Sequence, residues 1–414
     1  MLMTQGLIGL LVILLIAYAL SEARTAVRLK PIVIAVAIHF VLAVIFLKLP
    51  VFNDIFLWLN QMVLALEAAT TAGTSFVFGY LGGGSAPFEI QNEAAMFILG
   101  IKALPLILVI SALSYLLYYY RVLPAIVKVF SYLLQKSLGV SGSVGLSAAA
   151  NAFVGMVEAP LLIKPYLKQM TRGEIFAVMV AGMSTIAGTM MVLYATILSS
   201  KLDGAMGHIL TASVLNVFSA LIISMLMIPH QHDPKNDLIE LPKIAYSAMD
   251  AIVKGTTDGV KLLINIIAML IVLVALVSLA NQILLLLPEY HQQPITLQGI
   301  FGVIMAPLMF LIGIPYSEIF TAGSLMGTKV VLNEFLAYLD LLNLPADALS
   351  ERSQLIMIYA MCGFANIGSL GIMIGGLTAM SPERRDDIIS LGIKSILAGV
   401  LATCFTATVV GLII

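Results

Sequence analysis

Charged residues are scarce in this sequence. Asp, Glu, Lys and Arg together make up 10% of the 414 residues, whereas hydrophobic residues make up 61%. Soluble domains carry roughly 25% charged and about 45 to 50% apolar residues. So few charges cannot cover a water-soluble surface, and the mean hydropathy of +1.06 agrees with this. The composition excludes an ordinary soluble protein and predicts that most of the chain lies in lipid.

Cysteine and histidine are also rare, with two and five residues. Cys362 and Cys404 lie in apolar stretches without a second Cys or His at metal-ligand spacing, so we interpret them as packing residues. The sequence contains no HExxH motif, no pair of membrane aspartates and no serine beside a membrane histidine. A membrane hydrolase needs such a nucleophile and base or a metal cluster. We therefore expect no enzyme and no cofactor.

The net charge of −1 leaves no basic excess, so a nucleic-acid partner is not expected. The first apolar run, from Leu7 to Leu20, has no basic segment before it of the kind that a cleaved signal peptide carries. We interpret this run as a retained first helix.

Apolar runs of membrane-spanning length are abundant instead. A hydrocarbon core of roughly 30 Å requires about 20 apolar residues in a helix. The sequence predicts an all-α polytopic membrane protein with about eight transmembrane helices. The predicted spans lie near residues 6–20, 31–49, 96–119, 174–198, 207–228, 262–287, 353–378 and 390–414.

Two apolar stretches, 122–168 and 296–343, are broken near the middle by Gly, Pro and acidic residues. We predict two re-entrant helical hairpins here, because broken backbone at membrane depth must be buried in protein. A third stretch, Asn53–Thr71, carries Asp54, Trp58 and Glu67 among apolar residues. This pattern is typical of an interfacial helix, with an additional crossing as the alternative.

Lys and Arg concentrate on one side of the predicted membrane. Cytoplasmic loops retain positive charge, so this side is assigned to the cytoplasm and the N-terminus to the outside. A hydrophilic linker, His230–Lys243, falls on the same side. The cytoplasmic side collects Arg24, Arg28, Lys30, Arg121, Lys128, Lys136, Lys164, Lys168, Arg172, Lys235, Lys243, Lys254, Arg384 and Arg385, and the opposite side has little beyond Lys48, Lys201 and Arg352.

The chain contains an internal repeat, in which a hairpin is followed by an interrupted helix. The breaks fall at Asn151–Pro160 and Ser184–Thr189 in the first half, and at Gly313–Glu318 and Phe364–Ser369 in the second. The hairpins enter from opposite sides, so the halves are predicted to be inverted repeats. In transporters of this design, broken helices meet near the midplane and their free backbone groups and dipole ends bind solute and ion.

Four parts follow from this organisation. N-terminal scaffold helices with the interfacial helix occupy 1–120, and a linker, an interfacial helix and a scaffold span occupy 231–290. The two transport parts are predicted at 121–230 and 291–414, each with its hairpin, its broken helix and the following span.

Two carboxylates are predicted at the centre of the membrane. Placing the side chain of Glu158 or Glu334 at the centre of a membrane helix costs about 2.5 to 3.5 kcal/mol on insertion scales. A favourable interaction must therefore offset this free energy. We expect them to accept hydrogen bonds from a polar solute. Alternatively, backbone amides or a lysine such as Lys329 satisfy these two carboxylates. For a third glutamate, Glu318, the sequence allows either a role as a helix cap or a functional role.

Neutral oxygen-bearing side chains lie beside the breaks: Asn151, Thr185, Asn366 and Ser369. Hydrogen bonds between helices would explain any one of them. Together with unwound carbonyls, they also offer the hard oxygen ligands that a small cation such as sodium requires.

At these residues the chain resembles the concentrative nucleoside transporters over nearly its whole length. The resemblance is carried by GTSFVFG (Gly73–Gly79), SAAANAFVG running into EAP (Ser147–Pro160), STIAG (Ser184–Gly188), NEFLAY (Asn333–Tyr338) and CGFANIGS (Cys362–Ser369). It implies a sodium-driven nucleoside symporter in a bacterial inner membrane. It further implies a homotrimer, in which a transport part moves like an elevator against a scaffold.

The resemblance also implies roles for individual residues. Glu334, Asn366 and Ser369 would bind the ribose hydroxyls, with Phe364 as an apolar contact. The first hairpin tip, Gly155, Met156, Val157 and Glu158, would face the base. Sodium would bind the side chains of Asn151 and Thr185 and the carbonyls of Val154 and Ile186.

The first hairpin tip departs from the family pattern, which has Gly-Gln-Thr-Glu or a close variant. Met156 and Val157 offer shape and dispersion where Gln and Thr offer hydrogen bonds. Base selectivity is therefore predicted to be relaxed or redirected, and neither uridine nor adenosine is favoured. Two other functions are kept as alternatives: a proton-coupled symporter in which Glu158 titrates, and a non-transporting sensor of the same fold.

Overall fold

The computed structural model describes residues 2–89, 98–199, 201–229, 244–288 and 294–414. All regular secondary structure in these residues is helical, which confirms the all-α prediction. The predicted linker, His230–Lys243, lies outside the described residues. The N-terminal helices are α1 (Leu2–Ala19), α2 (Leu29–Lys48) and α3 (Pro50–Phe78), with short 3₁₀ turns η1 (Arg24–Ala26) and η2 (Gly79–Gly82).

The predicted repeat is present in the order of the elements. After α4 (Leu99–Lys102), the first half consists of α5 (Leu106–Tyr119), α6 (Val122–Leu138), α7 (Gly142–Asn151), α8 (Glu158–Leu161), α9 (Arg172–Ser184), α10 (Gly188–Leu198) and α11 (Ala205–Met227). The second half consists of α12 (Ala248–Leu284), α13 (Leu297–Leu311), α14 (Ile319–Val331), α15 (Glu334–Asn343), α16 (Glu351–Met361), α17 (Ile367–Met380) and α18 (Arg385–Ile413), with η4 (Pro382–Arg384) before α18. Each of the seven elements of one half has a counterpart in the other.

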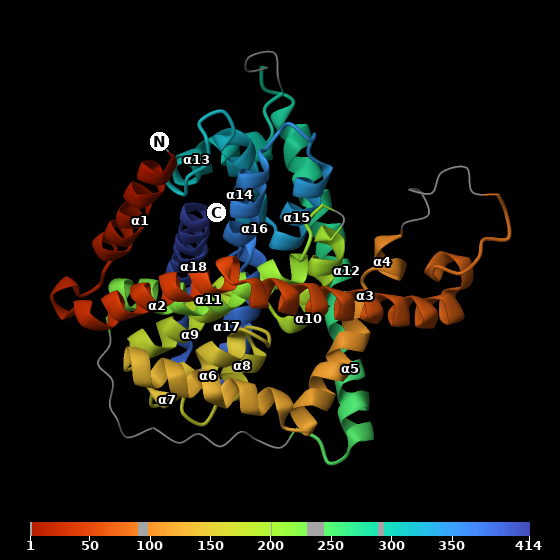
Figure 1. Cartoon of the computed structure of the whole chain (residues 1–414), viewed down its shortest axis with the longest axis horizontal. Coiled ribbons are helices and arrows are strands. Elements are labelled where there is room, and N and C mark those ends of the chain that lie inside the picture. The colour runs from red at the N-terminus through yellow and green to blue at the C-terminus, as the bar shows by residue number, and fades with distance from the viewer. Residues whose placement is uncertain (1, 90–97, 200, 230–243, 289–293) are drawn as a thin grey trace.

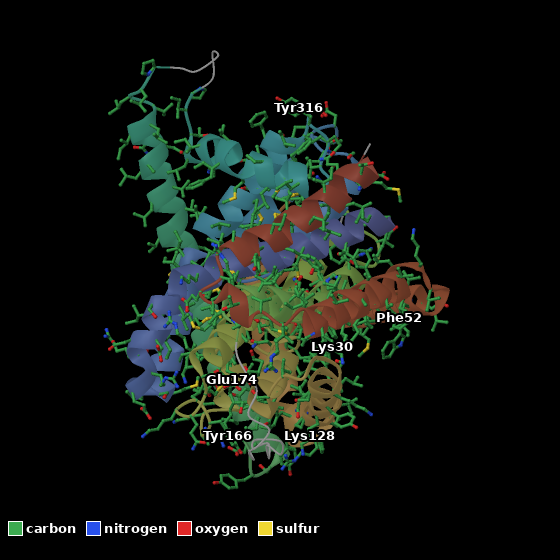
Figure 2. The ribbon with its side chains drawn as sticks, turned by 90° about the vertical axis from the view of Figure 1, so that its left-hand side faces the viewer. Lys30, Phe52, Lys128, Tyr166, Glu174 and Tyr316 are labelled. Carbon is green, nitrogen blue, oxygen red and sulfur yellow. The ribbon has the colours of Figure 1, made fainter. Side chains whose placement is uncertain are left out.

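The two hairpins approach from opposite ends of the molecule. Figure 1 shows α6, α7 and α8 at the lower end and α13, α14 and α15 at the upper end. Figure 2 labels Tyr316, before the second hairpin, near one end, with Lys128 and Tyr166 of the first hairpin region near the other. This arrangement agrees with an inverted repeat.

Helices of the right length and composition to cross a membrane are abundant among the described residues. Seven apolar stretches qualify: Leu29–Lys48, Asp54–Gly82, Leu99–Tyr119, Arg172–Leu198, Ala205–Met227, Ala248–Leu284 and Pro382–Ile413. Two predicted spans are absent from this set: 6–20, which falls in the shorter apolar helix Met3–Ala19, and 353–378, which is divided between α16 and α17. The stretch Asp54–Gly82 is long enough to cross, so the interfacial placement of Asn53–Thr71 stays a prediction.

The hairpins begin later than the sequence predicts. The stretch 122–168 divides at Gly139, whose φ of +66° is a left-handed value that favours glycine, so α6 is a separate helix before the hairpin arm α7. In the second half α13 is likewise separated from α14, with Gly313 at φ +97° in the intervening turn. The turn at Gly313 coincides with the predicted break Gly313–Glu318, whereas the turn at Gly139 was not among the predicted breaks.

Burial divides the helices into two groups. Most of the apolar window of Arg172–Leu198, of α11 and of Pro382–Ile413 is buried, 83% in each case, whereas none of the window of α12 is. α12 packs mainly along α5, and the two lie side by side in Figure 1. α1 and α2 pack against α18 and α11. The broken helices thus lie in a protein core, and α12 presents apolar side chains to its surroundings.

Candidate binding site between two broken helices

Both broken helices and the first hairpin tip meet at the centre of the core. The N–H of Gly188, where α10 begins, donates to the carbonyl of Phe153 at 3.0 Å. The N–H of Phe364 donates to the carbonyl of Thr185 at 3.3 Å, which joins the break in one half to the break in the other. A Cβ on Gly363 would lie 2.7 Å from the carbonyl oxygen of Ser184, so only glycine permits this approach.

Glu334 is the central polar group of this site. It is the first residue of α15 and is only 3% exposed. Tyr194 Oη of α10 donates to its Oε1 at 2.6 Å, and Asn366 Nδ2 donates to its Oε2 at 3.1 Å. The positive end of the helix dipole of α15 also favours a carboxylate here. The two oxygens retain lone pairs that can accept hydrogen bonds from a ligand's hydroxyl groups.

Asn366 links this carboxylate to the start of α17. Its Oδ1 accepts the N–H of Ser369 at 2.7 Å as the N-cap of the helix. Asn366 is 2% and Ser369 8% exposed, and Phe364 is half-buried two residues before the cap. The structure thus brings Glu334, Asn366 and Ser369 together.

The first hairpin tip packs against both broken helices. A Cβ on Gly182 of α9 would lie 3.0 Å from Met156 Cβ, and a Cβ on Gly376 of α17 would lie 2.8 Å from Val157 Cγ1. Met156 is 7% exposed and Val157 is half-buried. Small residues on the two helices therefore let these side chains approach closely.

Glu158 begins α8 but is exposed and does not join the Glu334 cluster. Its carboxylate lies near the backbone N–H groups of Val157 and of Glu158 itself, in agreement with the backbone-amide alternative left open by the sequence. A Cβ on Gly155 would lie 2.1 Å from its Oε2, so glycine is needed beneath this carboxylate. The tip therefore holds a backbone-stabilised carboxylate that is open to its surroundings.

A set of free oxygens lies beside these groups. Asn151 is fully buried at the end of α7, and neither of its side-chain polar atoms has a partner among the described residues. Thr185 Oγ1 donates to the carbonyl of Ala181 at 2.8 Å, which leaves its oxygen able to accept. The carbonyls of Val154 and Ile186 accept no hydrogen bond in the described part of the chain. Neutral amide, hydroxyl and carbonyl oxygens are suitable ligands for a small hard cation.

Two features of the site were not predicted from the sequence. Tyr194 supplies the shortest hydrogen bond to Glu334, although in the sequence it is one tyrosine in an apolar helix. Lys329, considered above as a partner of Glu334, makes no hydrogen bond in the described structure, although its side chain is completely buried. Glu318 accepts from Ser350 Oγ at 3.2 Å and makes no side-chain cap, which argues against the capping interpretation.

Models of known protein families match most of the chain. Residues 8–81 match the N-terminal and 208–411 the C-terminal family model of Na+ dependent nucleoside transporters, and 100–201 match the Gate family model, described as nucleoside recognition. An uncharacterised transporter of Haemophilus influenzae is 37% identical over 99% of this chain and 97% of its own length. The nucleoside permease NupC of Helicobacter pylori is 32% identical, with 99% and 97% covered. This chain belongs to the concentrative nucleoside transporter family.

The fold agrees with this assignment. A structure of the transporter CNTnw in an inward-facing substrate-bound state is 33% identical, with a TM-score of 0.90 over 100% of this chain and 98% of that chain. An outward-facing structure of a CNTnw variant gives 0.89 over the same shares of both chains. This concentrative nucleoside transporter is therefore a multi-pass membrane protein that transports nucleosides and is not an enzyme.

Proposed function

We propose that this transporter is a sodium-coupled symporter that imports nucleosides across a bacterial cytoplasmic membrane. The observation that carries the proposal is the juxtaposition of two unlike sites at the broken helices. One is a buried carboxylate with hydrogen-bonding neighbours, and the other is the set of free neutral oxygens around Asn151. A nucleoside offers ribose hydroxyls to the first, and a sodium ion fits the ligands of the second.

Each predicted residue has a defined part in this proposal. Glu334, Asn366 and Ser369 bind the ribose hydroxyls, and Phe364 contributes an apolar contact beside them. Residues 155–158 face the base. The side chains of Asn151 and Thr185 and the carbonyls of Val154 and Ile186 coordinate sodium.

The coupling between ion and nucleoside follows from the backbone contacts. Thr185 offers its hydroxyl to the ion, while its carbonyl accepts from Phe364 at 3.3 Å on the nucleoside side. An ion that orders the break between α9 and α10 therefore also orders the start of the nucleoside site. Binding of one ligand reduces the ordering cost for the other, which is positive coupling and is reciprocal.

The proposed mechanism is of the elevator type, with the N-terminus outside. The two hairpins and broken helices move as the transport part, and α5 and α12 belong to the scaffold. The homotrimer is proposed from the family resemblance, and the exposed apolar surface of α12 is covered by lipid or by neighbouring protomers.

Uptake into proteoliposomes tests the proposal. Labelled uridine, cytidine, adenosine and inosine are supplied with an inward sodium gradient, with a proton gradient, and with neither. We expect sodium-driven accumulation that Glu334→Gln and Asn151→Leu abolish. Glu383→Gln, a partly exposed glutamate that pairs with Lys168 outside the cluster, is the matched control and should transport normally.

The alternatives give different results. Uptake driven only by the proton gradient would support nucleosides as the substrate and would show that sodium is not the coupling ion. No uptake of any nucleoside by a folded protein would favour the non-transporting sensor.

A further inference from the structure

α11 is an unbroken helix that passes both interrupted regions of the core. It runs from Ala205 to Met227, and 83% of its apolar window is buried. It packs against α7, α9 and α16, which end at the first hairpin tip and at the two breaks. An unpaired polar group in such a helix costs free energy, so the hydrogen-bonding partners of its polar side chains indicate what those side chains do.

Ser213 of α11 bonds to the first hairpin tip. Its Oγ donates to the carbonyl of Ala152 at 3.1 Å, and the serine is 0% exposed. Ala152 directly follows Asn151, and no backbone N–H in the described part of the chain donates to its carbonyl. The next carbonyl, that of Phe153, accepts the N–H at the start of α10 at 3.0 Å. Two successive carbonyls are thus fixed, and the one after them belongs to Val154, a proposed sodium ligand.

Asn216 lies three residues further along α11 and bonds to the break in the second half. Its Nδ2 donates to the carbonyl of Cys362 at 2.7 Å, and the asparagine is 0% exposed. Cys362 follows the last residue of α16, and its carbonyl likewise accepts no backbone N–H among the described residues. The segment that Asn216 holds leads directly into Phe364 and Asn366 of the proposed nucleoside site.

These two hydrogen bonds have a fixed spacing. Residues three apart lie on the same side of a helix, about 4.5 Å apart along its axis. α11 is continuous between Ser213 and Asn216, so the two unwound segments cannot separate without breaking one of the bonds. A carbonyl that loses its donor inside the membrane is left unsatisfied, which is costly. The helix therefore favours one relative arrangement of the two segments.

We propose that Ser213 and Asn216 are positioning residues that hold the ion-binding and the nucleoside-binding segments in register on α11. Both act through the backbone carbonyls that they bind. Ser213 stabilises the tip that carries Asn151 and Val154, and Asn216 stabilises the break that leads to Asn366. The role of Ser213 rests on the sodium coupling proposed above, whereas the role of Asn216 requires only nucleoside transport.

Ser219 provides a matched comparison on the same helix. It lies three residues beyond Asn216, is 0% exposed, and its Oγ accepts from Thr406 of α18 at 3.1 Å. This bond joins two continuous helices and reaches neither unwound segment. Ser219→Ala thus removes a hydrogen bond of the kind that simply joins membrane helices. It should lower the melting temperature without changing the half-saturating concentration of either ligand.

Ser213→Ala is the test at the ion side, because it removes one hydroxyl group and adds no volume. Uptake into proteoliposomes is measured with the best transported of uridine, cytidine, adenosine and inosine. At saturating nucleoside, the sodium concentration for half-maximal uptake should rise roughly 2- to 13-fold, which corresponds to the loss of one hydrogen bond. At saturating sodium, the KM for the nucleoside should stay close to the wild-type value, because the bound ion orders the tip.

Asn216→Leu is the test at the nucleoside side, because it replaces the amide with an apolar side chain of similar size. The pattern should be reversed. The KM for the nucleoside at saturating sodium should rise roughly 2- to 13-fold, while the half-saturating sodium concentration at saturating nucleoside should change little. If Asn216→Leu does not fold, Asn216→Ser, which adds no volume, takes its place with the same expectation.

The remaining outcomes separate this inference from the proposed coupling. Shifts no larger than those of Ser219→Ala, or equal shifts for both ligands in both variants, would overturn the inference and leave sodium coupling intact. Nucleoside accumulation without sodium dependence in the wild type would instead show that the proposed coupling is wrong, and the KM of the Asn216 variants would then decide the role of Asn216. If no Asn216 variant folds, the contrast between Ser213→Ala and Ser219→Ala decides, because each removes a single oxygen atom.

Discussion

Tyr194 of the first half donates a hydrogen bond of 2.6 Å to Glu334 of the second half. The bond joins the second segment of one broken helix to the hairpin of the opposite repeat. The centroid of the Tyr194 ring also lies 5.1 Å from the centroid of the Tyr338 ring. The Tyr338 hydroxyl in turn donates to the carbonyl of Ile358 at 3.0 Å. The nucleoside site is therefore not contained in either repeat alone.

Tyr194→Phe is predicted to weaken nucleoside transport while preserving the fold. The substitution removes one donor from a buried carboxylate, which costs about 1 to 3 kcal/mol, or roughly 5- to 160-fold in kcat/KM. Uridine uptake kinetics at saturating sodium measure the effect. Tyr118→Phe is the control, because the Tyr118 hydroxyl is buried without a partner among the described residues. Equal effects of the two substitutions would contradict a specific role for Tyr194.

Gly363→Ala is predicted to impair sodium and nucleoside binding together. The new Cβ would lie 2.7 Å from Ser184 O and 2.9 Å from Thr403 Cγ2, so the two breaks would be pushed apart. Overpacking of this kind costs about 1 to 3 kcal/mol. Sodium-dependent thermal stabilisation and nucleoside uptake should both decline. Gly371→Ala, where the Cβ meets nothing within 4 Å, should behave like the wild type.

The first hairpin tip is predicted to determine base preference. Val157→Thr keeps the side-chain volume and restores a hydroxyl group, so it should change the order of uptake among uridine, cytidine, adenosine and inosine with little loss of stability. Met156→Gln should also change this order but lower the melting temperature, because Met156 is only 7% exposed between α9 and α17. Competition uptake assays give the ranking. An unchanged ranking in both variants would show that the tip does not contact the base.

Glu22 is predicted to stabilise the protein in a pH-dependent manner. A hydrogen bond from Arg172, with Lys394 as a second partner, holds the pKa of Glu22 below its ordinary value of 4.5. The stabilisation is therefore present above pH 4.5 and is lost as the pH falls through the lowered pKa. Glu22→Gln should lower the melting temperature at pH 7 by the equivalent of up to about 1 kcal/mol, since the pair is partly exposed.

The same comparison at acid pH provides the control for this prediction. Well below the lowered pKa, the carboxyl group is protonated, and the melting temperatures of Glu22→Gln and the wild type should converge. A difference that persists unchanged in acid would point to packing rather than charge.

The residues and their order along the chain were sufficient to predict the family and to propose most residues of the site. Long apolar runs imply membrane helices whatever their partners, because a hydrocarbon core accepts little else. The grouping of Glu334, Asn366 and Ser369, expected from the family resemblance, is present in the structure.

Tertiary packing decided the remaining features. The break between α16 and α17 was predicted from the sequence, but its partner was not: the backbone N–H of Phe364 donates to the carbonyl of Thr185 in the other repeat. Tyr194 is an ordinary tyrosine in the sequence, and only the crossing of the two halves brings its hydroxyl to Glu334. The sequence by itself determined the membrane class, the repeat and the carboxylates, because these depend on composition and local order. Which buried groups face one another was decided only by the folded structure, because hydrogen bonds and charges act between residues distant in the chain.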